Sequence, residues 1–287
     1  MRRAAIGFIV LLMSASVVAQ SVTEARFVLR DIRAWFPGEY DNAAQIFVES
    51  AFGAGDEGNH EWLHIEVETL TDSGLGDAVF RVTTSHRGDP DEEATVRLLA
   101  FSIDEDHRAV RMSRYDVAGA PLEADDVLWR RGADHVYGRL QRGADGHVDF
   151  RLTAEELWYD NGQRDDEIPL RLTKVRYYEC FALVHHADGD GMTLHNPFRL
   201  HDGDGVYSFA TEEPEPRTIE ILLRRSMWTS RSGNNFVPLL QLYVYENGDR
   251  DAPLANAWSE ADSGRVGFAA RGSLSARCKI PGPEPFQ

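Results

Sequence analysis

From Trp62 onward, the sequence alternates apolar and polar residues in a series of short segments. In the first of them, single polar residues separate Leu63, Ile65 and Val67. Successive side chains of a β-strand point to opposite faces of a sheet, so this period of two predicts strands with one buried face. The predicted strands cover residues 62–70, 78–84, 95–103, 109–117, 135–141, 148–152 and 170–178. Short strands separated by turn-forming Asp, Gly and Asn residues favour an antiparallel, calyx-like β-barrel or a sheet folded over itself.

One amphipathic helix is expected before these strands. Ser21-Val-Thr-Glu24 has the form of a capping box, in which the serine and glutamate side chains satisfy backbone amides of the first turn. Apolar residues then recur at helical spacing: Ala25, Val28, Leu29, Ile32 and Phe36. The pattern predicts a helix over residues 22–36, which Pro37-Gly38 ends.

The first 19 residues have the three parts of a secretory signal peptide. Arg2 and Arg3 precede an apolar run over residues 4–13, and the small residues Val17 and Ala19 precede the expected cleavage point. The run is far shorter than the roughly 20 residues of a membrane-spanning helix. We therefore expect an exported protein, periplasmic or extracellular, without a membrane span.

The charge balance argues against nucleic acid as a partner. The net charge is −17, and removal of residues 1–19 leaves 28 basic and 47 acidic residues, a net charge of −19. Such a chain is repelled by phosphate backbones and by anionic membrane surfaces.

The cysteines, Cys180 and Cys278, form an even pair. In an oxidising compartment the simplest expectation is one disulfide between two distant segments. A nucleophilic Cys180 beside His185 and His186 is the alternative.

The regular alternation of apolar and polar residues ends near Cys180, where Asp-Gly repeats interrupt the expected strands. Strands are expected again over residues 218–225, 236–245 and 265–271. We expect a barrel domain over residues 20–179, a β-rich module over 180–280 and a loose tail over 281–287.

The Asp-Gly loops of this module do not predict a metal site. The loop that starts at Asp188 places Met192 and Arg199 at positions where an EF-hand needs an oxygen ligand and a bidentate Glu. Turn chemistry explains the Asp-Gly pairs. We expect neither a metal ion nor another cofactor.

The segment Trp35-Phe-Pro-Gly-Glu-Tyr-Asp-Asn42-Ala-Ala-Gln45, directly after the expected helix, resembles the entry motif of the CpcT/CpeT chromophore (phycobilin) lyases. Later motifs follow in the family's order: Glu68 near a strand end, Arg97 on an arginine-bearing strand, Arg114-Tyr115-Asp116, Gly132-Ala-Asp134 and Glu156-Leu-Trp-Tyr-Asp160. The resemblance spans residues 22–178. Thr69 and Ala133 depart from it, because the family has glutamine and cysteine there.

The resemblance implies a barrel that binds an open-chain tetrapyrrole and attaches it to a cysteine of a partner protein. Arg97 and Arg114 would bind the two propionates, and Glu68 or Asp160 would supply a proton. Tyr115, Asn42 and Gln45 stand at further ligand-binding positions. The two amide side chains also suit hydrogen bonds that fix the loop after the helix.

Three functions remain open on the sequence alone. The protein could be a lyase-like enzyme, an exported calyx that binds a small hydrophobic or tetrapyrrole-like ligand without chemistry, or an envelope protein whose second module contacts a protein partner. Four tryptophans could stack on a ligand but are expected mainly in the core: Trp35, Trp62, Trp158 and Trp258.

Overall fold

The structure is a computed structural model, and it describes residues 23–51, 60–87, 93–122, 126–142, 146–160, 168–229, 236–271 and 274–281. The expected signal peptide, and the tail from residue 282, lie outside these residues. The chain forms two compact units, and each is treated by itself below. The first comprises the chain up to Asp41 together with Glu61–Lys174, and the second comprises Asn42–His60 and Val175–Gln287.

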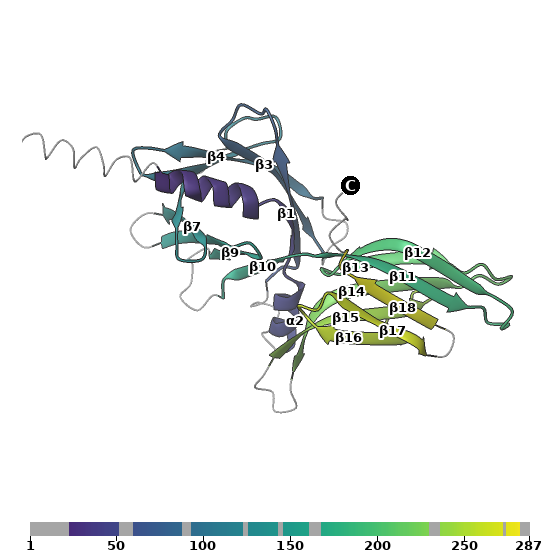
Figure 1. Ribbon diagram of the computed structural model, residues 1–287. Helices are drawn as coiled ribbons and strands as arrows, with labels where there is room; N and C mark the ends of the chain where they lie inside the picture. Colours follow the sequence, from purple (N-terminus) through teal and green to yellow (C-terminus); the bar gives the residue numbers. More distant parts are fainter. Residues whose placement is uncertain are drawn as a thin grey trace, which may run out of the picture. The chain divides into compact units, whose positions relative to one another are not determined.

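The first unit is a closed antiparallel β-barrel (Figure 1), which confirms the expected mainly β fold. Within the described residues ten strands form it: β1 (Gly38–Asp41), β2 (Leu63–Leu70), β3 (Ala78–His86), β4 (Thr95–Asp104), β5 (Ala109–Tyr115), β6 (Val127–Arg131), β7 (Val136–Arg142), β8 (Gly146–Leu152), β9 (Glu156–Asp160) and β10 (Leu170–Lys174). From β2 to β10 each strand pairs with the next one in the chain. The short β1 closes the ring between β2 and β10, where Tyr40 lies opposite both Ile65 and Lys174.

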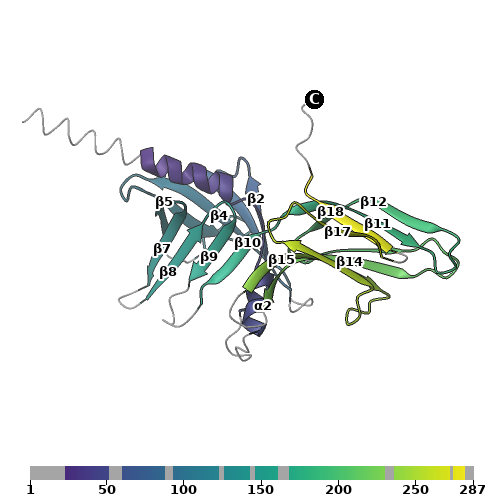
Figure 2. The same ribbon diagram turned by 60° about the horizontal axis from the view of Figure 1, so that its bottom comes forward.

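The expected helix is present over residues 23–35, and its apolar side is buried in the barrel core. Ala25, Val28, Leu29, Ile32 and Phe36 are each at most 5% exposed. The Arg33 guanidinium donates to the carbonyl oxygen of Asp77, the residue before β3. The helix therefore covers the end of the barrel where β3 begins, and Figures 1 and 2 show it lying against the strands.

The turn from this helix into β1 is fixed by two side chains from the barrel. The Tyr40 hydroxyl and the Lys174 ammonium group each donate to the Trp35 carbonyl oxygen, at 2.7 Å in both cases. Burial raises the pKa of the Tyr40 phenol, which keeps it a hydrogen-bond donor. Gly38 is needed between them, because it has φ of 133° and a Cβ atom there would lie 2.6 Å from Lys174 Cε.

In the described part of the second unit, the chain forms two four-stranded antiparallel sheets and one short helix. One sheet has the order β12-β11-β18-β17 and the other β13-β14-β15-β16. The elements are α2 (Ala43–Ala51), β11 (Tyr177–His185), β12 (Met192–His201), β13 (Gly205–Ala210), β14 (Thr218–Thr229), β15 (Phe236–Glu246), β16 (Ala255–Glu260), β17 (Arg265–Arg271) and β18 (Leu274–Lys279). Buried side chains of both sheets, such as Ala182 and Leu242, belong to one core, so the sheets pack face to face (Figure 2).

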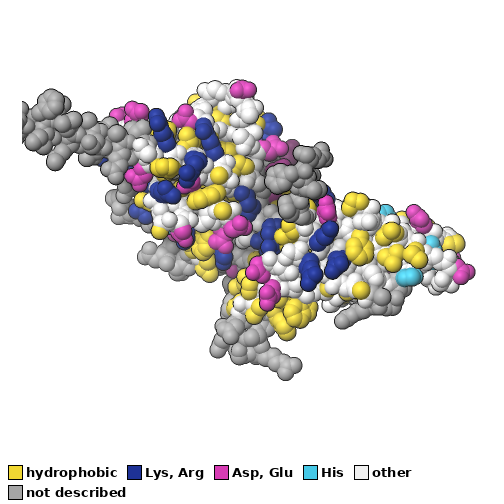
Figure 3. All heavy atoms as spheres, viewed as in Figure 1, with side chains coloured by type: hydrophobic (Ala, Val, Ile, Leu, Met, Phe, Trp, Pro, Cys, Tyr) yellow, Lys and Arg dark blue, Asp and Glu magenta, His cyan; other side chains and the backbone are white. Residues whose placement is uncertain are grey.

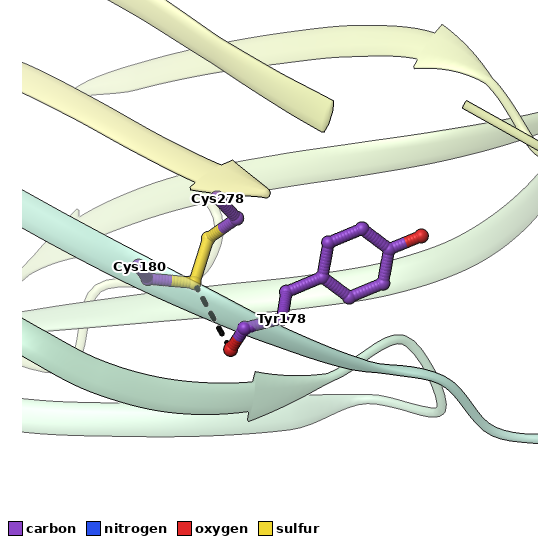
Figure 4. The surroundings of a disulfide bond; sticks show 3 residues. All are labelled: Tyr178, Cys180 and Cys278. Atoms are coloured by element: carbon purple, nitrogen blue, oxygen red, sulfur yellow. Dashed lines mark hydrogen bonds between the residues drawn. A yellow bond between two sulfur atoms is a disulfide. The ribbon is translucent and has the colours of Figure 1, made fainter. Parts of the chain in front are cut away.

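A disulfide joins Cys180 of β11 to Cys278 of β18 inside this core (Figure 4). The two residues lie directly opposite each other across the strand pair, with a Cα–Cα distance of 4.1 Å. The expected disulfide is confirmed. Because both sulfur atoms are bonded, the alternative of a nucleophilic Cys180 beside His185 and His186 is wrong.

Residues 170–178, expected as one strand, form the separate strands β10 and β11. The backbone amide of Arg176 donates to the Asp202 carboxylate at 2.7 Å instead of to a neighbouring strand, and its guanidinium donates to the same carboxylate at 2.8 Å. Asp202 is fully buried and is also paired with Arg225 at 2.9 Å. This buried acid therefore fixes Arg176, the residue before β11, within the second unit.

Candidate functional site

A cavity of about 370 Å³ lies inside the barrel. Most of its wall is apolar and partly aromatic: Phe36, Ile65, Val82, Leu99, Met112, Trp129, Phe150, Leu157 and Tyr159. The remaining lining residues are polar: Thr84, His86, Thr95, Arg97 and Arg114. Among the described residues, no Asp or Glu lines the cavity.

The helix-covered end of the barrel is packed with aromatic rings. Phe36 lies 5.1 Å from Phe80 and 5.7 Å from Phe101, and Phe101 lies 6.0 Å from Trp129, measured between ring centroids. Edge-to-face contacts at these distances are favourable and leave little space. These rings therefore close this end of the cavity, and Phe36 and Trp129 form part of its wall.

The cavity opens to solvent where β4 begins. Inward-facing residues of β4 run from Phe101, which is 1% exposed, through Leu99 to Arg97 and Thr95, which are both exposed. We call this opening the mouth of the cavity. The polar lining residues come from β3, β4 and β5, with Thr84 opposite Thr95 and Leu99 opposite Arg114.

Two of the residues expected from the sequence lie in the cavity wall, and they are Arg97 and Arg114. Among the described residues, no carboxylate lies within ion-pairing distance of Arg97. His86, the third basic residue of the wall, lies 3.2 Å from the exposed carboxylate of Glu61. The mouth therefore combines two permanent cations with an imidazole and carries no lining acid in the described residues.

Neither of the two expected proton donors lines the cavity. Glu68 pairs with Arg81 at 3.3 Å, and 52% of its side chain is exposed. Asp160 is the last residue of β9 and lies opposite Asp149. Tyr115 follows Arg114 on β5, so its side chain points to the opposite face of the sheet.

Asn42 and Gln45 belong to the second unit, and neither lines the cavity. The Asn42 carbonyl oxygen accepts from the amides of Gln45 and Ile46, at 2.9 and 3.1 Å, as expected at the N-terminus of α2. The Gln45 amide lies 3.2 Å from His60 Nδ1, and the buried Glu49 lies 2.7 Å from the same nitrogen. These contacts fix the segment after the barrel's first strand.

The tryptophan at the cavity is Trp129, which was not among those singled out from the sequence. Trp35 packs against the barrel core as expected. Trp62 donates to Asp41 and Trp158 donates to Glu156, so both are anchored outside the cavity. Trp258 was expected in a core but is 62% exposed, with its ring 6.0 Å from that of Trp228.

Basic side chains also gather on the face of the barrel unit that carries the helix (Figure 3). Arg26, Arg30 and Arg33 are exposed on the helix. Arg30 pairs with Asp31 at 2.7 Å, and Arg33 donates to the Asp77 carbonyl oxygen. The Arg33 contact joins the helix to the barrel, and none of these three residues lines the cavity.

No three His, Cys, Asp or Glu side chains converge on a common point within the part of the chain that the structure describes. Within the same residues, no helix has both the length and the apolar character needed to cross a membrane.

Comparison with models of known protein families and with curated protein sequences finds no match for this chain. Of the expected resemblance to the chromophore lyases, the structure shows only the antiparallel barrel. The geometry supports a ligand-binding barrel, whose wall contains a buried aromatic cluster.

Proposed function

We propose that the barrel binds a small amphipathic molecule whose apolar body lies inside the cavity and whose carboxylate, or similar anionic group, lies at Arg97 and Arg114. The observation that carries this proposal is the position of two guanidinium groups at the mouth of an otherwise largely apolar cavity. A guanidinium fork matches the geometry of a carboxylate and can donate two parallel hydrogen bonds to it.

The size and wall of the cavity suit such a ligand. Binding sites for small molecules commonly measure about 300–1,000 Å³ and combine apolar walls with a few polar groups that fix orientation. A cavity of about 370 Å³ lies at the lower end of that range. Burial of apolar ligand surface would supply most of the binding free energy, and the arginines would favour ligands that carry a negative charge.

The electrostatic setting favours an anionic ligand at the mouth. The chain as a whole has a net charge of −17, so anions are repelled from much of its surface. Arg97 is exposed at the mouth without a carboxylate partner among the described residues. Its charge is therefore available to a ligand.

An open-chain tetrapyrrole with two propionates is one molecule of this class, and it is the ligand that the resemblance to the chromophore lyases suggests. Attachment of such a pigment to a protein cysteine also needs a proton donor. Glu68 and Asp160, which the resemblance offers for that role, do not line the cavity. Binding without chemistry therefore has more support than lyase activity.

The location of the protein is part of the proposal. Structural disulfides such as Cys180–Cys278 persist in oxidising compartments. Together with the expected signal peptide over residues 1–19, the disulfide favours an exported carrier or sensor of small molecules.

Isothermal titration calorimetry with decanoate, decanol and phycocyanobilin tests the proposal. We expect decanoate to bind at least tenfold more tightly than decanol, because only the carboxylate can pair with the arginines. Equal affinities for decanoate and decanol would show that the arginines do not select an anionic ligand. Absence of binding by all three compounds would overturn the ligand-binding function. A shifted visible absorption band of phycocyanobilin would place tetrapyrroles within the accepted class.

A second candidate function is contact with a protein partner through the second unit. Trp228 and Trp258 are 57% and 62% exposed and lie side by side, with Val237 opposite Trp228 on the same sheet. Adjacent exposed tryptophans are typical of interaction surfaces. Changing both tryptophans to serine should abolish co-purification of a specific exported protein while leaving decanoate binding intact. Unchanged co-purification would exclude this surface.

A further inference from the structure

The hydroxyl group of Tyr159 is a hydrogen-bonding group of the cavity wall that the barrel itself does not use. Tyr159 lines the cavity from β9, while its neighbours on the strand, Trp158 and Asp160, belong to the outer face. Its ring packs against the barrel core and lies 5.1 Å from the ring of Phe150. The hydroxyl makes no hydrogen bond with any residue that the structure describes, and its oxygen atom stays accessible. It can therefore bind a molecule that enters the cavity.

Tyr159 and Arg97 lie on opposite walls of the barrel. In the closed ring of ten strands, β9 is five strands away from β4 in either direction. A ring of this size is roughly 18–20 Å across between Cα atoms. Both residues line the cavity and have long side chains, which span most of this width. A small head group with a hydrogen bond on each side fits between their ends.

The register of the strands places the two residues at the same depth. One row of paired residues leads from β4 to β9 through Ile103, Val110, Trp129, Gly138, Phe150 and Tyr159. Because the strands of a closed barrel are tilted, such a row climbs towards the mouth, and the registers of all the strand pairs give a climb of about 12 residues per circuit. Half a circuit therefore climbs by about six residues, which is the separation of Ile103 from Arg97 on β4. Tyr159 is consequently level with Arg97.

We propose that Tyr159 is a third ligand-binding residue, and that its hydroxyl donates a hydrogen bond to the same anionic head group that Arg97 and Arg114 bind from the opposite wall. This inference rests on the ligand-binding function proposed above. It adds that the head group lies between the two walls of the mouth, with the apolar body of the ligand directed towards the aromatic end of the cavity.

A free carboxylate suits this arrangement better than a neutral head group. Its two oxygen atoms offer about four lone-pair positions, so it can accept hydrogen bonds from both walls at once. A hydrogen bond from a phenol to an ionised oxygen is also stronger than one to a neutral oxygen. The class of ligand is therefore a free carboxylic acid with an apolar body, and the corresponding alcohol or ester should bind more weakly.

The test is calorimetric titration of decanoate and decanol into the full chain and into Tyr159→Phe, which keeps the ring and removes the hydroxyl. The affinity for decanoate should fall by about tenfold, as expected for loss of a hydrogen bond to a charged group. The affinity for decanol should fall by less than about threefold, because a hydrogen bond to a neutral oxygen is weaker.

Tyr137→Phe is the matched control. Tyr137 is a half-buried residue of β7 and does not line the cavity. Loss of its hydroxyl should leave both affinities unchanged. Equal weakening of decanoate binding by both substitutions would refute a specific contact from Tyr159.

A double variant tests whether the arginine and the tyrosine bind one head group. If Arg97 and Tyr159 contact the same carboxylate, the effects of Arg97→Gln and Tyr159→Phe depend on each other. The loss of decanoate affinity in the double variant should then differ from the product of the two single losses by at least about twofold. A loss equal to that product would show two separate contacts and overturn the shared head group.

The outcomes separate this inference from the function on which it rests. If decanoate binds Tyr159→Phe as tightly as the wild-type protein, or if decanoate and decanol are weakened to the same extent, the hydrogen bond from Tyr159 to the anion is refuted while ligand binding stands. If decanoate does not bind the wild-type protein, the ligand-binding function itself fails.

A second measurement does not depend on a folded variant. In the wild-type protein labelled with ¹³C at the ζ carbon of tyrosine, one tyrosine resonance should move on addition of decanoate and much less on addition of decanol. Equal movement with both compounds would refute the hydrogen bond to the anion.

Discussion

Arg97 and Arg114 are diagonal neighbours across the β4–β5 pair, on the inner face of the barrel. Arg114 lies opposite Leu99, and Arg97 is two residues before Leu99 on the same strand. Cα atoms in this relationship are about 7–8 Å apart, within reach of two long side chains that converge on one anion. The barrel thus brings together two cations that are 17 positions apart in the chain.

The first prediction concerns the charge at the mouth. Arg97→Gln should weaken decanoate binding by about tenfold or more, because a hydrogen bond to a charged group contributes about 1.5–3 kcal/mol. Decanol binding should stay within about twofold, since no anion is present to pair. Calorimetry with both ligands measures the difference.

Arg139→Gln is the matched control for this change. Arg139 makes a bidentate pair with Asp149, at 2.8 and 2.9 Å, and does not line the cavity. Its loss should leave the affinity for decanoate unchanged. Equal weakening by both substitutions would indicate a general electrostatic effect and contradict a specific role for Arg97.

The second prediction concerns the packing of Trp129. A Cβ atom at Gly138 would meet Trp129 Cε2 at 2.6 Å and Val127 Cγ1 at 2.8 Å. Gly138→Ala should therefore lower the free energy of unfolding by about 1–3 kcal/mol, the usual cost of overpacking. Chemical denaturation followed by circular dichroism gives this value.

Gly264→Ala provides the comparison, because no atom lies within 4 Å of a Cβ atom at Gly264. That substitution should change the stability by less than about 0.5 kcal/mol. A Gly138→Ala protein as stable as the wild type would mean that Trp129 is not tightly packed.

The period of two was sufficient to predict most of the barrel, because each strand buries one face and its sequence records that alternation. The same reasoning missed β1, β6 and β9, which have four or five residues and are too short for a pattern to stand out. It also missed α2, because the nine residues of this helix show no clear apolar stripe, although Asn42 before it is a favoured N-cap residue. Asn42 and Gln45 were interpreted through the family resemblance instead of as the start of a helix.

The alternation of apolar and polar residues predicts which side chains point into the barrel. To that extent the candidate site was predictable from the sequence. Arg97 and Arg114 share the parity of inward-facing residues such as Leu99, so both point inward. Glu68 follows the buried Val67 and therefore points outward, which the resemblance did not take into account. Trp129 could have been found from Val127-Leu-Trp129, but its N–H group lacks a partner only in the packed structure.

The third prediction concerns the disulfide, which closes a loop with a sequence separation of 98 residues. A loop of about this length should reduce the conformational entropy of the unfolded second unit, so removal of the bond should cost about 2–5 kcal/mol. Urea denaturation with and without a thiol reductant should show a lower midpoint for the second unit. Cys180→Ala combined with Cys278→Ala should reproduce the shift without reductant.

Decanoate binding is the control for this experiment, because the cavity lies entirely in the first unit. It should be the same in the reduced and oxidised proteins. Loss of binding on reduction would mean that the two units do not fold independently.

The fourth prediction concerns the acid stability of the second unit, through Glu213. The Thr211 hydroxyl, the Ala187 amide and the Arg217 guanidinium donate to its carboxylate at 2.6, 2.7 and 2.6 Å. These hydrogen bonds, with that of Thr211 first, lower the pKa of Glu213 from 4.5 to about 2. The folded state therefore favours the ionised form. Its contribution to stability is complete above pH 4.5 and is lost as the pH falls towards 2.

Glu213→Gln should consequently be less stable than the wild type at pH 7, and the difference between them should shrink as the pH falls from about 4.5 to about 2. Thermal unfolding of both proteins across this range measures the change. Glu212→Gln is the matched control, because Glu212 is exposed one position away and its loss should alter stability little at any pH. A Glu213→Gln deficit that stays constant from pH 7 to pH 2 would show that the carboxylate contributes through packing and not through its charge.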